Sequence, residues 1–220
     1  MPFTVPWKSE IRGQTLAIFL PQPYRALGWA PLGGGWRRAQ LIVNHQISLN
    51  DRVATQSPQP YLGRVVRSLG VNPRHAVAMM TGAQIKRAAS TTEKRGDTIV
   101  TAWCTAGCSN ALRVGDMASV EVTAPGTINL IVLIGQPLTE AAMVEAIQIA
   151  TEARVAALFA ARVKSVRSGK RATGTGTDCI VVAAPEKSPV HFYCGKHTRL
   201  GELIGRAAYR SCARSLAKRS

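Results

Sequence analysis

Short apolar runs, separated by turns that contain glycine or proline, recur along the chain and predict a protein built largely from strands. The clearest run covers residues 125–134; from Ile128 onward it is apolar except for Asn129, which indicates a strand buried on both faces. A buried amide needs partners, so Asn129 is either held by the protein or directed at a ligand. Further strands are predicted at residues 15–20, 41–43, 76–80, 97–103, 179–184 and, at a sheet edge, 190–193.

Three segments show the spacing typical of helices. In residues 60–69 the apolar positions recur every three or four residues, and a glycine follows. A second helix is predicted to begin after Thr139, whose hydroxyl can cap it, with Glu140 in its first turn. A third helix is predicted from about residue 198 toward the C-terminus. The polar segment 88–97 is predicted to be a turn.

The order of these elements predicts the fold class. Residues 125–184 read as strand, helix, glycine loop and strand, which is a crossover unit. A length of 220 residues favours one domain. We therefore expect a single α/β domain with a mixed sheet flanked by helices, or alternatively a layered α+β arrangement with two sheets between helices. Residues 1–23 are a less certain N-terminal extension, and residues 211–220 are expected to form a basic tail.

Composition restricts the class of protein. The hydrophobic content of 46% is that of a globular chain, and no apolar run is long enough to cross a bilayer. The N-terminus shows no secretory signal, so no membrane segment is expected. Five cysteines, an odd number without a regular framework, are expected to be reduced thiols in a cytoplasmic protein.

A formal net charge of +16 suggests an anionic partner or surface. Aromatic residues make up only 5% of the chain and do not alternate with basic ones, so nucleic acid is an unlikely partner. On the last predicted helix, basic residues recur every four positions and form one stripe, for which a solvated face is favoured over a docking surface. The stripe consists of Arg206, Arg210, Arg214 and Lys218.

Residues 172–178 combine glycines, threonines and one aspartate directly before a predicted strand. Glycine lets backbone approach a ligand closely, and consecutive N–H groups in such a bend can hold an anion or a carbonyl oxygen. Thr175 and Thr177 add hydroxyl groups, and Asp178 places a carboxylate at the start of the strand. A tight turn in which Asp178 bonds local backbone is the structural alternative.

A second polar segment, 195–202, follows about twenty residues later and places Lys196, His197 and Glu202 close together in sequence. The predicted strand 41–43 delivers Asn44 and His45 at its end, where sites are common in α/β proteins. Asn110 lies in a small-residue loop after another strand.

Metal binding has weak support in the sequence. Cys104 and Cys108 are spaced like two ligands on a helix, but no second pair follows at metal spacing. The histidines and acidic residues of the two polar segments fit no known ligand motif. No metal site or cofactor is therefore assigned, and a metal requirement is left open.

Five segments, taken in order, resemble the adenosylcobinamide amidohydrolase family over roughly residues 24–210. They are Gly33-Gly34-Gly35 with Asn44, Thr105-Ala106-Gly107 with Asn110-Ala111, Gly126-Thr127-Ile128-Asn129, residues 172–178, and Gly195-Lys196-His197-Thr198 with Leu200-Gly201-Glu202.

The resemblance implies hydrolysis of the amide that joins the aminopropanol arm to the corrin ring of adenosylcobinamide. The product, adenosylcobyric acid, would re-enter cobamide synthesis, and the cobalt belongs to the substrate. The chain departs from the family where Gly28-Trp29-Ala30 replaces a serine-rich turn, and Cys108 stands where an apolar residue is common.

Amide hydrolysis needs a base or nucleophile, a group that stabilises the oxyanion and an acid for the leaving amine. We expect a catalytic set in one pocket with the glycine-threonine bend, water attacking directly, and His197 or His45 as the base. The expected catalytic residues are Asp178, Lys196, His197 and Glu202. The expected substrate-binding residues are Asn44, His45, Asn110, Asn129, Gly174, Thr175, Gly176 and Thr177.

The substrate carries no phosphate and does not account for the charge of +16. A second class of function therefore stays open, a non-catalytic protein that binds a corrinoid or nucleotide and carries a basic docking surface. A homo-oligomer also stays open.

Overall fold

The structure is a computed structural model that describes residues 5–48, 50–118, 126–188 and 191–218. The helices are α1 (Arg52–Gln56), α2 (Pro58–Ser68), α3 (Glu140–Ala160) and α4 (Arg199–Ala217), with short 3-10 turns η1 (Pro73–His75) and η2 (Ile85–Arg87). The strands are β1 (Lys8–Arg12), β2 (Thr15–Gly28), β3 (Gly35–Gln46), β4 (Ala76–Thr81), β5 (Ala89–Arg95), β6 (Thr98–Ala106), β7 (Ala111–Leu112), β8 (Ile128–Ile134), β9 (Gly174–Thr175) and β10 (Cys179–Pro185).

Eight strands form one mixed sheet, which confirms the predicted fold class. Their order is β4-β3-β2-β10-β8-β6-β5, and β1 pairs with β2 beside this path. The pairs β3–β4 and β8–β10 are parallel, and the other pairs are antiparallel. The short strands β7 and β9 pair separately.

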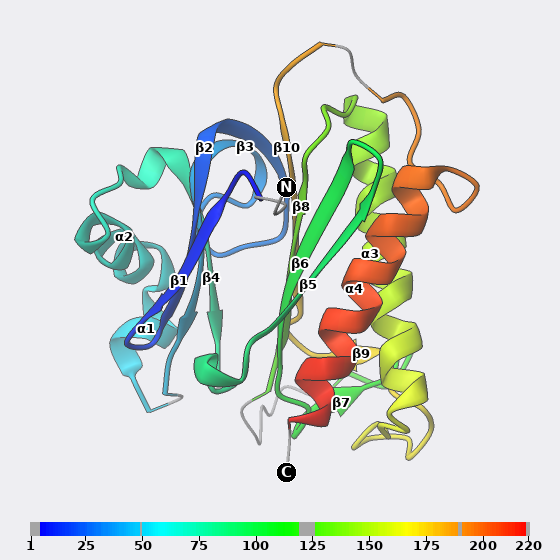
Figure 1. Cartoon of the computed structure of the whole chain (residues 1–220). Coiled ribbons are helices and arrows are strands. Elements are labelled where there is room, and N and C mark those ends of the chain that lie inside the picture. Colours follow the sequence, from blue (N-terminus) through cyan, green and yellow to red (C-terminus); the bar gives the residue numbers. More distant parts are fainter. Residues whose placement is uncertain (1–4, 49, 119–125, 189–190, 219–220) are drawn as a thin grey trace.

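The sheet folds over on itself at the ribbon formed by β2 and β3 (Figure 1). The first half of β2, up to Phe19, pairs with β1, whereas the half from Tyr24 pairs with β10. The register shifts between these two residues, where Pro21 and Pro23 lack the N–H that a regular ladder requires. One sheet therefore supplies two facing layers.

The layers are held together by three apolar clusters. Between the two halves of the sheet, buried residues of β2, β3 and β4 pack against buried residues of β8 and β10. On the outer face of the first half, Leu62 and Val66 of α2 pack over Leu41 and Val43. On the outer face of the second half, α3 and α4 cover β6, β8 and β10. The order of layers is helix, sheet, sheet, helix, which matches the layered alternative as well.

Two local predictions were wrong. The polar segment 88–97 is not a turn but contains β5, whose side chains alternate between buried and exposed positions against β6. The predicted edge strand 190–193 is reduced, among residues 191–193, to a single bridge between His191 and Leu138; Val190 lies outside the described residues. The predicted cap of α3 is confirmed, because the Thr139 hydroxyl accepts a hydrogen bond from the Ala142 N–H at 3.2 Å.

The ends of the chain belong to the fold as far as the structure describes them. Residues 8–28 form β1 and the central strand β2. Residues 211–217, where the sequence suggested a basic tail, are the last turns of α4, and Cys212 and Leu216 are buried there. No helix among the described residues is both long and apolar enough to cross a membrane.

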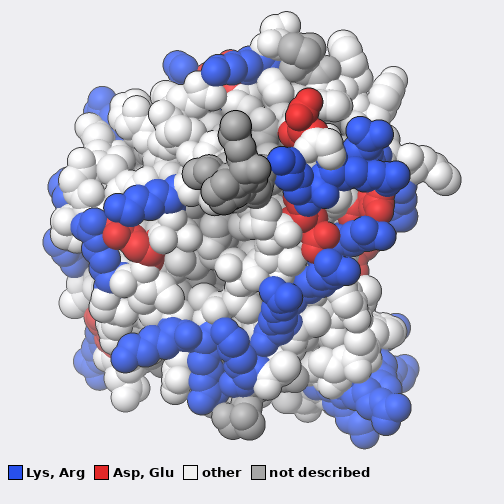
Figure 2. Space-filling view, viewed as in Figure 1, with Lys and Arg blue, Asp and Glu red and all other residues white. Residues whose placement is uncertain are grey.

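The basic stripe of α4 lies along β5 (Figure 2). Arg210 pairs with Glu93 at 2.6 Å, Arg214 donates to the Ser90 carbonyl, and Lys218 donates to the Ala88 carbonyl. Arg206 pairs with Glu202 within the helix at 3.0 Å. The stripe is therefore not simply a solvated face, because it attaches α4 to an edge strand.

Candidate functional site

Four of the five segments that carried the family resemblance meet at one end of the folded sheet. At this end β3, β4 and β6 finish while β8 and β10 begin. Asn129 pairs across the ladder with Thr105 on one side and with Cys179 on the other. The sequence placed these segments far apart, and strand direction alone brings them together.

A buried pair of amides joins the two halves of the sheet at this end. The Asn129 Nδ2 donates to the Asn44 Oδ1 at 2.8 Å and to the Met80 carbonyl at 2.7 Å. The Asn44 Nδ2 donates to the Thr105 hydroxyl at 2.8 Å. Both asparagines are only 1% exposed, so they form a floor below the surface and do not face solvent.

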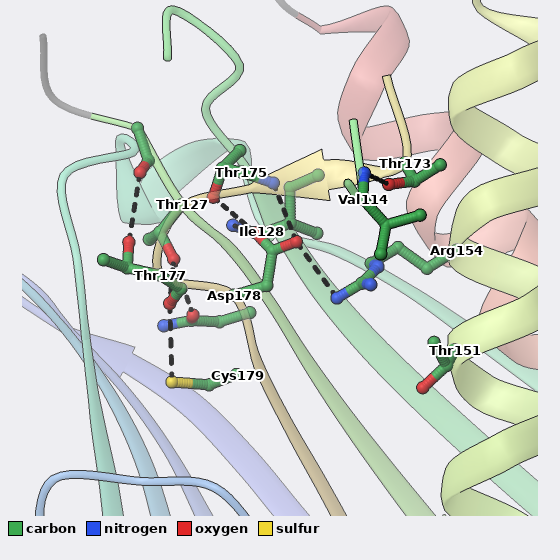
Figure 3. A network of polar contacts seen from close by, with 12 residues as sticks. Val114, Thr127, Ile128, Thr151, Arg154, Thr173, Thr175, Thr177, Asp178 and Cys179 are labelled. Atoms are coloured by element: carbon green, nitrogen blue, oxygen red, sulfur yellow. Dashed lines mark hydrogen bonds and ion pairs between the residues drawn. The ribbon is translucent and has the colours of Figure 1, made fainter. Parts of the chain in front are cut away.

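The glycine-threonine bend is fixed by Asp178, which accepts four contacts (Figure 3). Its carboxylate accepts from the Ile128 N–H and the Thr175 N–H, both at 2.9 Å, and from the Thr175 hydroxyl at 2.5 Å. Arg154 of α3 completes the set with an ion pair at 3.0 Å. Asp178 therefore bonds local backbone, as in the tight turn that was the structural alternative to a ligand site. Gly176 and Thr177, at the tip of the bend, are exposed.

The glycines of this end permit close contacts that a side chain would block. A Cβ on Gly174 would lie 2.2 Å from the Asp178 Oδ2, and one on Gly126 would lie 2.1 Å from the Asn110 Oδ1. Asn110 in turn donates to the Gly126 carbonyl at 2.9 Å. The bend and the Asn110 loop are thus locked to the start of β8, where the Thr127 hydroxyl also donates to the Thr177 carbonyl.

His45 lies at the same end but on the opposite face of β3 from Asn44. Its Nδ1 is 2.8 Å from the Thr15 hydroxyl, and its Nε2 is 3.1 Å from the Tyr61 hydroxyl of α2. Burial lowers the pKa of His45, although the charge of Asp51 opposes this shift. The imidazole is therefore neutral near pH 7, which is the form that can accept a proton.

The other predicted catalytic residues lie at the opposite end of the sheet, which corrects the expectation of one pocket. β10 runs about 20 Å away from Asp178 before the chain reaches Lys196 and His197. Figure 1 shows the start of α4 at the top of the view and β9 at the bottom. Lys196 pairs there with Glu152, and Glu202 pairs with Arg95 and Arg206. The sequence could not reveal this separation because both segments flank the same strand.

Two hollows are lined by residues that contact the buried asparagine pair or follow its partners in the chain. The larger, about 880 Å³, is lined by the tip of the β2–β3 hairpin, the junction of α1 with α2, and Met80, whose carbonyl holds Asn129. The smaller, about 610 Å³, is lined by residues that follow Thr105 directly and by η2. Sequence reasoning missed the contributions of Thr15 and Tyr61, because neither belongs to a motif, and it noted Trp29 only as part of a departure from the family pattern.

Thiol and metal chemistry have little support in the described parts of the chain. Burial raises the pKa of Cys179 and of Cys194 to about 12, with smaller contributions from Asp178 and Glu145 respectively, so neither is a ready nucleophile. None of the five cysteines forms a disulfide bond. No three His, Cys, Asp or Glu side chains converge among the described residues.

Comparison with known proteins identifies relatives across most of the chain. The model of the adenosylcobinamide amidohydrolase family matches residues 4–220. An uncharacterised protein of Methanocaldococcus jannaschii is 30% identical over 203 residues, covering 84% of this chain and 79% of that protein. The adenosylcobinamide amidohydrolase of Halobacterium salinarum is 28% identical over 200 residues, covering 88% of this chain and 77% of that protein.

Two solved structures overlap loosely with the fold. A Pyrococcus horikoshii protein superimposes with a TM-score of 0.48 at 14% identity, covering 98% of this chain and 80% of that one. An L-aminopeptidase D-Ala-esterase/amidase from Ochrobactrum anthropi superimposes with a TM-score of 0.42 at 10% identity. The match covers 96% of this chain and 82% of that one. Overlaps this loose bear on no step of the chemistry.

Proposed function

Because this chain belongs to the adenosylcobinamide amidohydrolase family, we propose that it hydrolyses the amide between the aminopropanol arm and the corrin ring of adenosylcobinamide. The observation that carries the proposal is the meeting of four motif segments at one end of the sheet, around Asn44 and Asn129. The substrate is a corrinoid, and the product re-enters cobamide synthesis by salvage. We place the reaction in the cytoplasm, which the absence of a disulfide bond among the five cysteines supports.

We assign the base to His45 and not to His197. Of the four histidines, His45 is the one on the strand that carries Asn44, although its ring lies on the other face of β3 from the asparagine pair. Its lowered pKa favours the neutral form. Hydrolysis breaks the amide C–N bond: water gives its hydroxyl to the carbonyl carbon and a proton to the aminopropanol nitrogen. His45 would accept the proton of the attacking group and return it to the leaving amine.

The exposed bend is the part of this end that a substrate can touch. Gly176 and Thr177 are exposed, and the backbone around them is held still by Asp178. A preorganised N–H or hydroxyl aimed at the developing oxyanion is typically worth about 2.7–4 kcal/mol of barrier. We assign this task to the bend, with Asp178 as the residue that positions it.

The test is the release of aminopropanol from adenosylcobinamide by the purified protein, with the corrinoid product identified by mass. Thr177→Ala at the bend is expected to lower kcat/KM, whereas Lys196→Ala at the opposite end is expected to leave it unchanged. Both side chains are exposed, so neither change should unfold the protein. The reverse result would move the site to the other end of the sheet. Repeating the assay after chelation decides whether a metal is needed.

If the corrinoid binds and no aminopropanol appears, the non-catalytic binding protein becomes the better description.

A further inference from the structure

We propose that the larger hollow holds the corrin ring, with one face of the ring against the indole of Trp29. This inference rests on the proposed function and adds to it a binding site for the part of the substrate that does not react. The hollow measures about 880 Å³ and lies between the β2–β3 hairpin tip and the α1–α2 junction. Ligand sites usually fall in this range of volume.

Trp29 gives the hollow a broad apolar wall that the fold leaves uncovered. Its side chain is 60% exposed, whereas Trp7 and Trp103 are buried in the core between the two halves of the sheet. An indole left open in the wall of a cavity can bury a large area against a flat ligand.

The triple glycine contributes a part of the lining that carries no side chains. Gly33 and Gly35 have φ values of +73° and +78°, which favour glycine. A Cβ on Gly33 would lie 2.3 Å from the Ala76 carbonyl oxygen, and one on Gly34 would lie 2.5 Å from the Ala30 carbonyl oxygen. The triple glycine therefore brings backbone close to β4 and leaves the hollow open. Pro58 and Pro60 add stiff apolar surfaces to the lining.

The polar groups in the hollow match a ring with a fringe of amides. Arg37 lines it and forms no ion pair within the described chain; its Nε is buried without a partner. Gln56, Ser57 and Gln59 also line it and are exposed, and no side-chain hydrogen bond of theirs is seen among the described residues. Amide, hydroxyl and guanidinium groups of this kind can pair with the peripheral amides of a corrinoid, while its apolar faces meet Trp29 and the prolines.

The hollow lies next to the reacting end. Met80 lines it, and the carbonyl of the same residue accepts from Asn129. The Trp29 N–H donates at 3.2 Å to the carbonyl of Ile180, two residues after Asp178. A ring seated in the hollow would therefore lie beside the strands that carry the asparagine pair and the bend. The smaller hollow offers no aromatic side chain.

The experiment measures corrinoid binding by quenching of tryptophan fluorescence, with Trp36→Ala as the matched control. Trp36 lies on the same hairpin and is 44% exposed, but it stacks with Arg25 and lies outside the hollow. We expect Trp29→Ala to raise Kd about tenfold, Trp29→Phe to restore most of the affinity, and Trp36→Ala to leave Kd unchanged. The same loss is expected with adenosylcobinamide and with cyanocobinamide, which lacks the adenosyl group.

Unchanged affinity in Trp29→Ala, or an equal loss in both alanine variants, would overturn the proposal. A loss confined to adenosylcobinamide would also overturn it, since the indole would then bind adenine and not the corrin ring. Failure of the proposed function looks different, because it appears as absent aminopropanol release in the unaltered protein while the titration reports binding independently.

Discussion

Nδ1 of His45 lies 2.8 Å from the Thr15 hydroxyl, and the other ring nitrogen lies 3.1 Å from the Tyr61 hydroxyl. Burial, the charge of Asp51 and a hydrogen bond to Asp51 raise the pKa of Tyr61, against the opposing charge of Arg64. When Tyr61 donates to Asp51, its oxygen accepts from the His45 Nε2–H. Nδ1 then carries no proton and accepts the hydrogen bond of the Thr15 hydroxyl, so it is the ring nitrogen that can act as the base.

Replacing this base should slow turnover without a matching loss of binding. We expect His45→Gln to lower kcat for aminopropanol release by about 10²–10⁴, the usual contribution of a positioned base. His197→Gln, at the opposite end and exposed, should retain the original rate. Steady-state kinetics on both variants checks this, and a loss confined to His197→Gln would return the base to the segment that the sequence first suggested.

His45 should also make stability depend on pH. Because its pKa is lowered in the folded protein, the unfolded chain binds a proton first, below about pH 6.5. The stability it contributes is therefore full above that pH and is lost as pH falls toward the lowered pKa. We expect urea midpoints measured from pH 7.5 to 5 to fall less in His45→Gln. Equal slopes in the unaltered protein and in His45→Gln would contradict the assignment.

The bend offers a matched pair of glycines. Gly174→Ala would place a Cβ 2.2 Å from the Asp178 carboxylate, whereas the nearest atom to a Cβ on Gly176 is the Leu112 Cδ1 at 3.7 Å. We expect Gly174→Ala to destabilise by about 1–3 kcal/mol and to reduce activity, and Gly176→Ala to be nearly neutral in stability. Chemical denaturation and the aminopropanol assay test both variants. Equal effects of the two substitutions would show that the bend can rearrange to accommodate the added Cβ on Gly174.

The pair of Asp178 with Arg154 should be strongly coupled. The two side chains are 9% and 13% exposed, so removing one leaves a buried charge without its partner. We expect Asp178→Ala to cost about 3–5 kcal/mol of unfolding free energy. Because Arg154→Met removes the other charge, the double variant should lose less than the sum of the single variants. If the losses in unfolding free energy of the two single variants simply add in the double variant, backbone contacts alone hold the bend.

The last turns of α4 should be essential to the fold. Leu216 is 5% exposed and belongs to the cluster under α3 and α4. We expect Leu216→Ala to cost about 2–5 kcal/mol, whereas Lys218→Ala, on the exposed side of the same turn, should change stability little. Thermal melting of both variants tests this prediction. If residues 211–217 were a dispensable tail, Leu216→Ala would be tolerated as well as Lys218→Ala.

Much of the local structure could be predicted because the information lies within a few residues. The Thr139 cap, the apolar run that became β8 and the bend before β10 were each predicted from neighbouring positions. β5 was missed because its polar residues alternate over a buried face that only β6 defines. The helix that became α4 was predicted, but the burial of its last turns was not, because that burial depends on contacts with β5 and β6, far away in sequence.

The sequence by itself determined the family, the elements and the chemistry of each motif, since residue types and short spacings express these directly. Tertiary structure decided which motifs share a site. The parallel pairing of β8 with β10 and the bend of β2 bring Asn44, Asn129 and the glycine-threonine bend to one end, and they leave His197 at the other. Strand direction is set by pairing partners distant in the chain, so no local pattern records it.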